Sequence, residues 1–405
     1  MNILTPFSAL CTVGLFAKFS YALARSPVLA LFALYLGAGP EAIGLIVGIS
    51  TVTGIFFKLP SGALSDVIDR NKTMLLGLIV FAILPFTYLF VKDYNVLLVI
   101  RFIHGFATAI YGPVSMAVVA DIAKGKHGEM LSWFSSITII GNLIGAPIGG
   151  FILHNLSKTP EPSIGDFQTV YIVSGIAGVI SLIIALKVLN TAEAVNKGRV
   201  LKESFKRFAS GIKEVVSDKR IVITSNMEGV QNMAVGALEA FLPIYAVTVA
   251  GLNEFQAGIL WGIQVLVTIL SKPIMGKMSD KSGRKAIITV GMLLCAFSFA
   301  SIPLLRGFYP LLTAALVFGF GEAFVTSSSA ALVADICRQK HFGTAMGTFG
   351  TIYDVGHASG PILAGLLITR LDYLYAFWII SSILILSIPV FIIGVKTAEA
   401  NPPVP

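Results

Sequence analysis

The sequence predicts an all-α integral membrane protein with twelve transmembrane helices in two six-helix repeats. Three observations predict this fold class: a low content of charged residues, a series of apolar stretches of spanning length, and an internal duplication. Charged residues make up 12% of the 405 residues and hydrophobic residues 56%. A soluble domain carries about 25% charged residues. The polar side chains are therefore too few to cover a surface that faces water.

The apolar stretches are long enough to cross a bilayer as helices. A spanning helix needs about 20 apolar residues, so with short connections a chain of this length accommodates about twelve. Backbone groups in lipid must be hydrogen-bonded within their own segment, which favours helices. No signal-peptide pattern precedes the first stretch, so we expect it to be retained. The predicted spans are 7-36, 41-61, 73-91, 95-122, 130-154, 169-189, 222-249, 255-275, 286-306, 308-335, 343-369 and 373-395.

The basic residues are distributed unevenly between the two sides of these spans. Short loops rich in Lys and Arg remain in the cytoplasm. Most of the basic residues that give the net charge of +8 lie in loops of one side, whereas the other side carries Lys92, Lys158, Arg306 and Arg370. This asymmetry places both termini in the cytoplasm and the chain in the cell membrane. It also accounts for the basicity without a nucleic-acid partner.

An internal duplication relates the two parts of the chain. Its copies lie 214 residues apart and divide the chain into an N-terminal half (1-190), a cytoplasmic linker (191-219) with an expected amphipathic helix near 200-216, and a C-terminal half (220-405). Parallel repeats of this kind occur in secondary transporters, whose substrate site lies between the repeats. The matching pairs are Lys58 and Lys272, Gly62 and Gly276, Asp66 and Asp280, Arg70 and Arg284, Gly105 and Gly319, and Asp121 and Asp335.

The loop after the eighth predicted span carries a family resemblance. The run from Gly276 through Asp280, Gly283 and Arg284 to Lys285 resembles the signature loop of the major facilitator superfamily. The first copy keeps Gly62, Leu64, Asp66 and Arg70, but has Val67 where a basic residue is usual and Asp69 where glycine is usual. The resemblance covers the whole chain. It implies a transporter that works by alternating access rather than an enzyme.

The charged residues of this loop suggest a conformational latch. Asp66 and Asp280 can accept hydrogen bonds from free N–H groups at a helix start. Arg70 and Arg284 then need anionic partners, and Asp121 and Asp335 lie at the cytoplasmic ends of spans four and ten. We expect these pairs to gate the cytoplasmic face, and Gly62 and Gly276 to permit close approach of the chain. The alternative is a loop that serves only stability and topology.

The fourth span carries an arginine at mid-bilayer depth. Arg101 to Gly105 resembles the Arg-x-x-Gln-Gly motif of proton-coupled members of the superfamily, with His104 in place of Gln. A charge at this depth is costly, and such residues are functional by default. The resemblance implies that Arg101 influences the protonation of a nearby acid. Alternatively, Arg101 is held by backbone carbonyl groups.

Two spans contain glycine and proline runs. Glycines four residues apart allow a neighbouring helix to approach closely, and proline can bend a helix. The runs resemble a Gly-Pro-rich motif of the antiporter branch, which implies export. The alternative is that they only pack helices. The residues are Gly141, Gly145, Pro147 and Gly149 in the fifth span and Gly356, Gly360 and Pro361 in the eleventh.

Ionisable residues inside the spans predict a charged cavity. Lys18 and Arg25 share one face of the first span, with Pro27 as a break beyond them, and Glu228 and Glu239 share one face of the seventh. Such a cavity suits zwitterionic or anionic solutes, or an internal ion pair that breaks during transport. Lys58 and Lys272 are expected to extend to the cytoplasmic surface. The full set of candidate cavity residues is Lys18, Arg25, Arg101, His104, Glu228, Glu239, Glu322 and Asp354.

These observations predict a secondary active transporter that couples protons to the efflux of small organic compounds. The alternative is symport or exchange of a small organic anion or zwitterionic metabolite. A third reading is a receptor or assembly subunit that does not transport. No Walker loop and no metal or nucleophile motif occurs, so we expect no cofactor and no enzymatic activity. The expected partners are the substrate, protons and the lipid bilayer, and we expect the chain to function as a monomer.

Overall fold

The computed structural model describes residues 6–65, 69–123, 126–157, 161–189, 218–337 and 342–395. The predicted linker helix near 200-216 and Asp66 lie outside these residues. Within them the secondary structure is helical. The elements are α1 (Pro6–Leu23), α2 (Val28–Tyr35), α3 (Pro40–Ser65), α4 (Arg70–Thr87), η1 (Tyr88–Phe90), α5 (Tyr94–Ile122), α6 (His127–Leu156), α7 (Ile164–Leu189), α9 (Lys219–Thr248), α10 (Glu254–Ser282), α11 (Arg284–Ser301), η2 (Ile302–Leu304), α12 (Phe308–Ile336), α13 (Phe342–Arg370) and α14 (Tyr373–Gly394).

The helices match the predicted spans in number and order. Eleven segments of the described chain are long and apolar enough to cross a membrane, and α1 with α2 form one of them. The first span is thus broken, because α1 ends at Leu23 and α2 begins at Val28, with Pro27 between them. Helix α13 has 29 residues but is not among the eleven. It lies between α3 and α9 and carries Asp354 and His357.

Polar residues mark where several helices begin. An Asp or Asn side chain that accepts a hydrogen bond from the first turn stabilises a helix start by about 1 kcal/mol. Asp69 accepts from the backbone N–H of Lys72 at 2.8 Å before α4. Asn253 and Gln256 form a reciprocal capping box at the start of α10. These caps explain why the spans begin directly after short polar loops.

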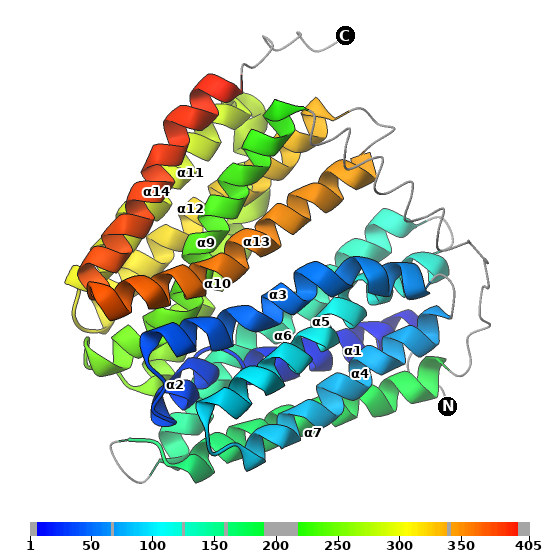
Figure 1. Cartoon of the computed structure of the whole chain (residues 1–405). Helices are drawn as coiled ribbons and strands as arrows, with labels where there is room; N and C mark the ends of the chain where they lie inside the picture. The colour runs from blue at the N-terminus through cyan, green and yellow to red at the C-terminus, as the bar shows by residue number, and fades with distance from the viewer. Residues whose placement is uncertain are drawn as a thin grey trace.

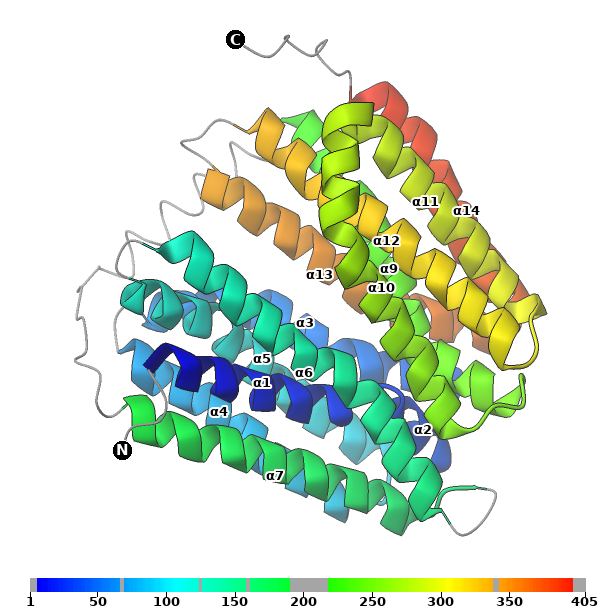
Figure 2. The same cartoon turned by 180° about the vertical axis from the view of Figure 1, so that it is seen from behind.

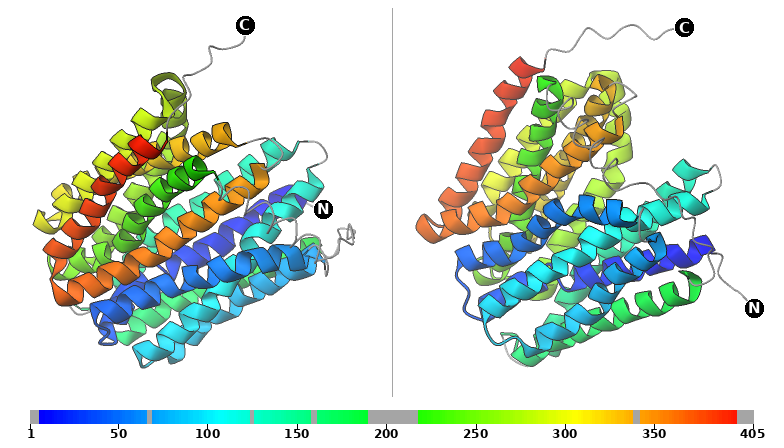
Figure 3. Two further views of the ribbon diagram at one scale, coloured as in Figure 1. Left: turned by 45° about the horizontal axis from the view of Figure 1, so that its top comes forward. Right: turned by 45° about the vertical axis from the view of Figure 1, so that its right-hand side comes forward.

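The helices form two groups, α1 to α7 and α9 to α14 (Figures 1 and 2). We propose that these groups are the two halves of the duplication. Between the groups, α3 packs against α13 and α6 packs against α10. The groups meet near α2 and diverge toward the end that carries the N-terminus, as the further views in Figure 3 also show. With the N-terminus in the cytoplasm, as the distribution of basic residues predicts, the structure is closed on the outer side of the membrane.

Glycines bring the two groups into backbone contact at the outer end. A Cβ atom at Gly258 of α10 would lie 2.7 Å from the backbone oxygen of Ala146, and one at Gly48 of α3 would lie 2.8 Å from that of Ala358. Real Cβ atoms do not approach this closely, so only glycine fits. We call these contacts the outer seal. Its glycines are Gly44, Gly48, Gly150, Gly258, Gly262 and Gly365.

The glycines of the two glycine and proline runs make a second set of helix contacts. Gly141, Gly145 and Gly149 of α6 face α1 and α2, whereas Gly356 and Gly360 of α13 face Gly229 and Met233 of α9. These contacts lie within each helix group. The prolines behave differently: the Pro147 ring contacts Gly262 of α10, whereas Pro361 contacts Gly44 of α3 with its backbone oxygen and Gly236 of α9 with its ring. The glycines of each run therefore pack its own group, and the residues at the prolines also contribute to the outer seal.

Candidate functional site

A cavity of about 650 Å³ lies between the two helix groups. One wall consists of residues from α1, α3, α5 and α6, and the other of residues from α9, α10, α12 and α13. The lining runs from Ser26 and Glu239, near the break between α1 and α2, to Lys58 and Lys272 in the cytoplasmic parts of α3 and α10. The cavity therefore lies on the cytoplasmic side of the outer seal.

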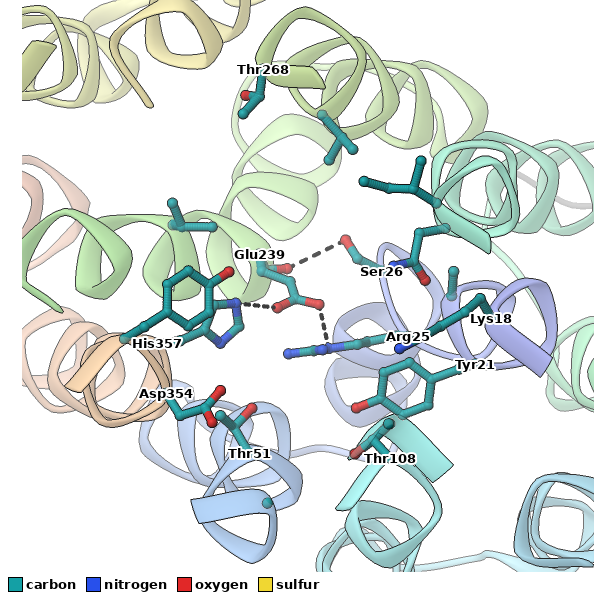
Figure 4. Close-up of a pocket in the computed structure, with 18 of the residues that line it drawn as sticks. Lys18, Tyr21, Arg25, Ser26, Thr51, Thr108, Glu239, Thr268, Asp354 and His357 are labelled. Carbon is teal, nitrogen blue, oxygen red and sulfur yellow. Dashed lines mark hydrogen bonds and ion pairs between the residues drawn. The ribbon is translucent and has the colours of Figure 1, made fainter. Parts of the chain in front are cut away.

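A buried ion pair joins the two walls. The Arg25 Nε atom, just beyond the end of α1, pairs with Oε1 of Glu239 on α9, whose side chain is 4% exposed (Figure 4). The second carboxylate oxygen of Glu239 lies 3.4 Å from His357 Nε2 on α13. The Ser26 hydroxyl donates to the backbone oxygen of Glu239 at 3.4 Å. Removing one partner of a buried pair leaves an uncompensated charge, which costs about 3–5 kcal/mol.

Tyr21 separates the cavity from Arg101. The guanidinium of Arg25 lies 5.4 Å from the centre of the Tyr21 ring, and that of Arg101 lies 5.7 Å from it. Arg101 is fully buried and donates from Nη2 to the Ser50 hydroxyl at 2.6 Å. That hydroxyl also lies 3.4 Å from the Tyr21 hydroxyl. Tyr21 and Ser50 therefore connect Arg101 to the cavity wall.

Arg101 has no carboxylate within ion-pair distance in the described part of the chain. Its neighbour His104 is also fully buried, with Nδ1 3.1 Å from the Tyr88 hydroxyl. Neither residue lines the cavity. The positive charge of Arg101 therefore acts on the cavity from behind the aromatic ring of Tyr21.

Two further groups of charged residues line the cavity. Lys58 Nζ lies 2.5 Å from Asp354 Oδ2, an ion pair between α3 and α13. The sequence predicts that the Lys58 side chain extends to the cytoplasmic surface; this side chain is 42% exposed, and it also pairs across the cavity. Lys18 faces the cavity, and no carboxylate of the described residues lies within ion-pair distance of it. Glu322 and Lys272 lie on the wall formed by α10 and α12.

The loop arginines form ion pairs within each helix group. Arg70 Nη1 lies 2.7 Å from Asp121 Oδ2 and so links α4 to α5. Arg284 lies 2.9 Å from Asp335 Oδ2 and 2.5 Å from Asp280 Oδ1, and so links α11 to α12 and α10. A gate built from these pairs would act by fixing helices within a group, because none of them crosses the cavity.

The glycines of these loops differ in their surroundings and backbone conformation. A Cβ at Gly276 would meet no atom within 4 Å, and the nearest atom to one at Gly62 is 3.9 Å away. Among the described residues, the expected close approach is therefore not made at these two positions. Gly283 has a φ of +87°, a conformation that glycine adopts without steric cost. This glycine permits the turn between α10 and α11.

The cavity brings together Lys18, Arg25, Glu239, Glu322 and Asp354 from the predicted set, whereas Arg101, His104 and Glu228 lie behind its walls. Sequence reasoning gave no role to several neutral polar residues of the site. They form hydrogen bonds with the charged residues of the site. The sequence feature that could have identified them is a hydroxyl or amide group inside an apolar span. These residues are Ser26, Ser50, Gln264 and Thr268.

The chain belongs to the Major Facilitator Superfamily, whose family model matches residues 10–271 and 230–405. It is 25% identical over 387 residues to an uncharacterized MFS-type transporter of Methanocaldococcus jannaschii, with 94% of each chain covered. It is also 23% identical to the riboflavin transporter RibZ of Clostridioides difficile, covering 76% of this chain and 75% of that one. It is 22% identical to the synaptic vesicular amine transporter of Bos taurus, covering 81% of this chain and 61% of that one.

Solved structures show the same fold. The nucleoside transporter NupG superposes with a TM-score of 0.77 at 14% identity, covering 98% of this chain and 100% of that one. A bacterial homologue of the human lysosomal transporter Spinster, in an inward-facing and unoccupied conformation, gives 0.77 at 13% identity, covering 96% and 94%. The chain is therefore a multi-pass transporter of the cell membrane and not an enzyme.

Proposed function

We propose that this transporter exports small organic compounds from the cytoplasm in exchange for protons, by alternating access. The observation that supports this function best is the position of Glu239. Its buried carboxylate lies in a cavity on the cytoplasmic side of the outer seal, between Arg25 of one helix group and His357 of the other. The cytoplasmic position of the cavity suits a substrate taken from inside the cell.

Glu239 can balance one positive charge at a time. Burial makes an uncompensated carboxylate costly, so Arg25, a cationic group of the substrate and a proton compete for it. A cationic substrate that pairs with Glu239 would release Arg25, remove the link between α1 and α9, and allow the outer end to open. After the substrate leaves on the outer side, a proton takes its place and the transporter returns.

This competition leads to exchange. When substrate and proton need the same site, the binding of one weakens the binding of the other, so the two are carried in opposite directions. On return to the cytoplasmic side, Arg25 displaces the proton from Glu239, and the proton leaves to the cytoplasm. The relatives support a cationic substrate. Amines are organic cations at neutral pH, and the bovine relative is named as a vesicular amine transporter.

Proton movement in proteoliposomes that contain a pH-sensitive dye tests this function. Lipophilic organic cations and small organic anions are added in turn. We expect the cations to evoke proton movement that Glu239→Gln abolishes. Glu129→Gln, which removes an exposed carboxylate paired with Lys126, is the matched control and should retain it. Equal proton movement in Glu239→Gln and in the parent protein would contradict the proposal.

A second candidate function is proton-coupled symport or exchange of a small organic anion or zwitterion. It is favoured by Lys18, which lines the cavity without an ion-pair partner in the described chain and lies two helical turns before Arg25. In this case an anionic substrate would compete with Glu239 for Arg25, whereas a cationic substrate would compete with Arg25 for Glu239. Proton uptake that accompanies an anion and is abolished by both Lys18→Ala and Arg25→Ala would establish this function instead.

A further inference from the structure

A second buried polar cluster lies in the group formed by α9 to α14, apart from the Arg25–Glu239 pair, and part of it lines the cavity. We call it the carboxylate–amide cluster. None of its side chains is more than 9% exposed. Its members come from three helices that pack together: Glu228, Gln231 and Asn232 of α9, Gln264 and Thr268 of α10, and Glu322 of α12.

One oxygen of each carboxylate in this cluster accepts hydrogen bonds from neighbouring side chains. Glu322 Oε2 accepts from Gln264 Nε2 and lies 3.0 Å from the Thr268 hydroxyl. Glu228 Oε1 accepts from Asn232 Nδ2 at 3.3 Å. The Thr268 hydroxyl has one hydrogen, yet three acceptor oxygens lie within 3.1 Å of it, including those of Gln264 and Gly319. Only one of these three oxygens can accept the Thr268 hydrogen.

Several buried acceptor oxygens of the cluster have no donor. Glu228 Oε2, Asn232 Oδ1 and Gln264 Oε1 make no hydrogen bond, and one donor of the cluster, Gln231 Nε2, is also unpaired. Leaving a buried polar atom unpaired costs about 1–3 kcal/mol, and more for a charged group. Asn232 bonds to Glu228 and Gln264 bonds to Glu322 through their other atoms, so an unpaired oxygen lies beside each carboxylate. The two carboxylates also interact electrostatically with each other. A ligand that binds oxygen lone pairs would satisfy the unpaired oxygens.

The charges of the cluster are also unbalanced. Glu228 and Glu322 carry two negative charges when ionised, and the basic residue that interacts electrostatically with both is Lys272. Lys272 is exposed and forms no ion pair with either carboxylate. When both carboxylates are ionised, this buried region lacks a balancing positive charge, which a bound monovalent cation would supply.

We propose that the carboxylate–amide cluster binds a sodium ion. The ligands are the carboxylate oxygens of Glu228 and Glu322 and the amide oxygens of Asn232 and Gln264, because hard cations prefer such oxygen ligands. No group of three or more His, Cys, Asp and Glu side chains that could hold a metal ion occurs in the described ranges. A sodium site needs no such group.

The bound ion would have a structural consequence for transport. It would hold α9, α10 and α12 together, and α9 also carries Glu239, three helical turns beyond Glu228. Sodium would thus stabilise the helix that positions the central carboxylate. The site requires neither substrate nor proton exchange, so it can be tested independently of the proposed function.

Radioactive sodium binding to the full-length protein in nanodiscs, with choline as the replacing cation, tests this site. We expect saturable binding of about one ion per chain. Glu228→Gln and Glu322→Gln should each weaken it by at least about 10- to 100-fold, the loss that is typical even of residues that only orient a metal ligand. Glu129→Gln removes one negative charge outside the cluster and should leave binding unchanged.

Two results would overturn the proposal. One is the absence of saturable sodium binding to the wild-type protein, as would follow if a proton neutralised the cluster. The other is an unchanged affinity in both glutamine variants. If these variants do not fold, Thr268→Val and Gln264→Leu remove neutral groups and keep both carboxylates. Weaker sodium binding in both would then support the site, and wild-type affinity in both would exclude it.

Discussion

The two ends of the contact between the helix groups are built differently. At the outer end, Gly258 and Gly48 lie against backbone oxygens of the opposite group, and contact depends on the absence of side chains. At the cytoplasmic end, contact is made by the long side chain of Lys58, which reaches Asp354 and is 42% exposed. Close backbone packing closes the outer end, whereas an ion pair joins the two groups at the cytoplasmic end.

This difference indicates which contacts stabilise the closed and open arrangements of the two helix groups. Backbone contact at several glycines forms only when whole helices meet, so the outer seal favours fully closed or fully open arrangements. An exposed ion pair contributes only about 0.2–1 kcal/mol and can break and re-form in water. The buried Arg25–Glu239 pair lies between these ends and is the element whose charge state can favour one arrangement over the other.

The largest expected effect follows from a methyl group in the outer seal. A Cβ at Gly44 of α3 would overlap the backbone of Pro361 on α13, which cannot move away as a side chain could. We expect Gly44→Ala to reduce the transport rate by more than about tenfold, since 1.4 kcal/mol of lost seal contact already corresponds to a factor of ten. Substrate flux in proteoliposomes measures this rate.

Gly350→Ala is the control for this substitution, because it lies on α13 with no atom within 4 Å of the added carbon. It should transport at the wild-type rate. If the two variants transport equally well, the outer seal does not depend on glycine.

An intermediate effect is expected at the loop arginines. Arg284→Ala removes two ion pairs that fix α11 to α10 and α12. Each pair is partly exposed, so we expect transport to slow by about two- to tenfold with unchanged expression. The control is Arg220→Ala, which removes an exposed pair with Asp218 at the start of α9. A wild-type rate in Arg284→Ala would leave the loop with a role in stability or topology alone.

The smallest effect is expected at the cytoplasmic ion pair. Lys58→Ala and Asp354→Asn should each slow transport by no more than about fivefold, because the Lys58 side chain is 42% exposed to water, although that of Asp354 is 13% exposed. The double variant should be no slower than the slower single variant, since both substitutions remove the same interaction. A loss as large as that of Gly44→Ala would show that the cytoplasmic end controls the cycle.

The fold was predictable from the sequence because it depends on local properties. Apolar length determines the spans, and the repeated residues identify the transporter family. The interruption of the first helix followed from Pro27. The partners Asp121 and Asp335 could also be proposed for Arg70 and Arg284, because both loops repeat the same spacing.

The arrangement of the candidate site was less predictable because it depends on contacts between the two helix groups. Glu239 and Arg25 were both expected to face a cavity, but their pairing requires α9 and α1 to meet at one depth. Arg101 was expected in the cavity, whereas Tyr21 covers it. Lys58 could not be paired with Asp354 from sequence spacing, since 296 residues separate them.

The central claim is that the Arg25–Glu239 pair keeps the outer end closed. Distances between spin labels test it most directly, in a background that carries Cys337→Ser to remove a partly exposed thiol. One pair of labels replaces Leu156 and Val249 at the outer ends of α6 and α9. A second pair replaces Trp133 and Ile274 in the cytoplasmic parts of α6 and α10. All four positions are exposed.

Wild-type protein should give a short, narrow distance distribution for the outer labels. We predict that Glu239→Gln moves the outer labels to longer distances and the cytoplasmic labels to shorter ones, because the uncharged side chain no longer holds Arg25. Glu129→Gln should leave both distributions unchanged. Identical distributions in Glu239→Gln and wild type would contradict the claim that this ion pair controls which side of the transporter is open.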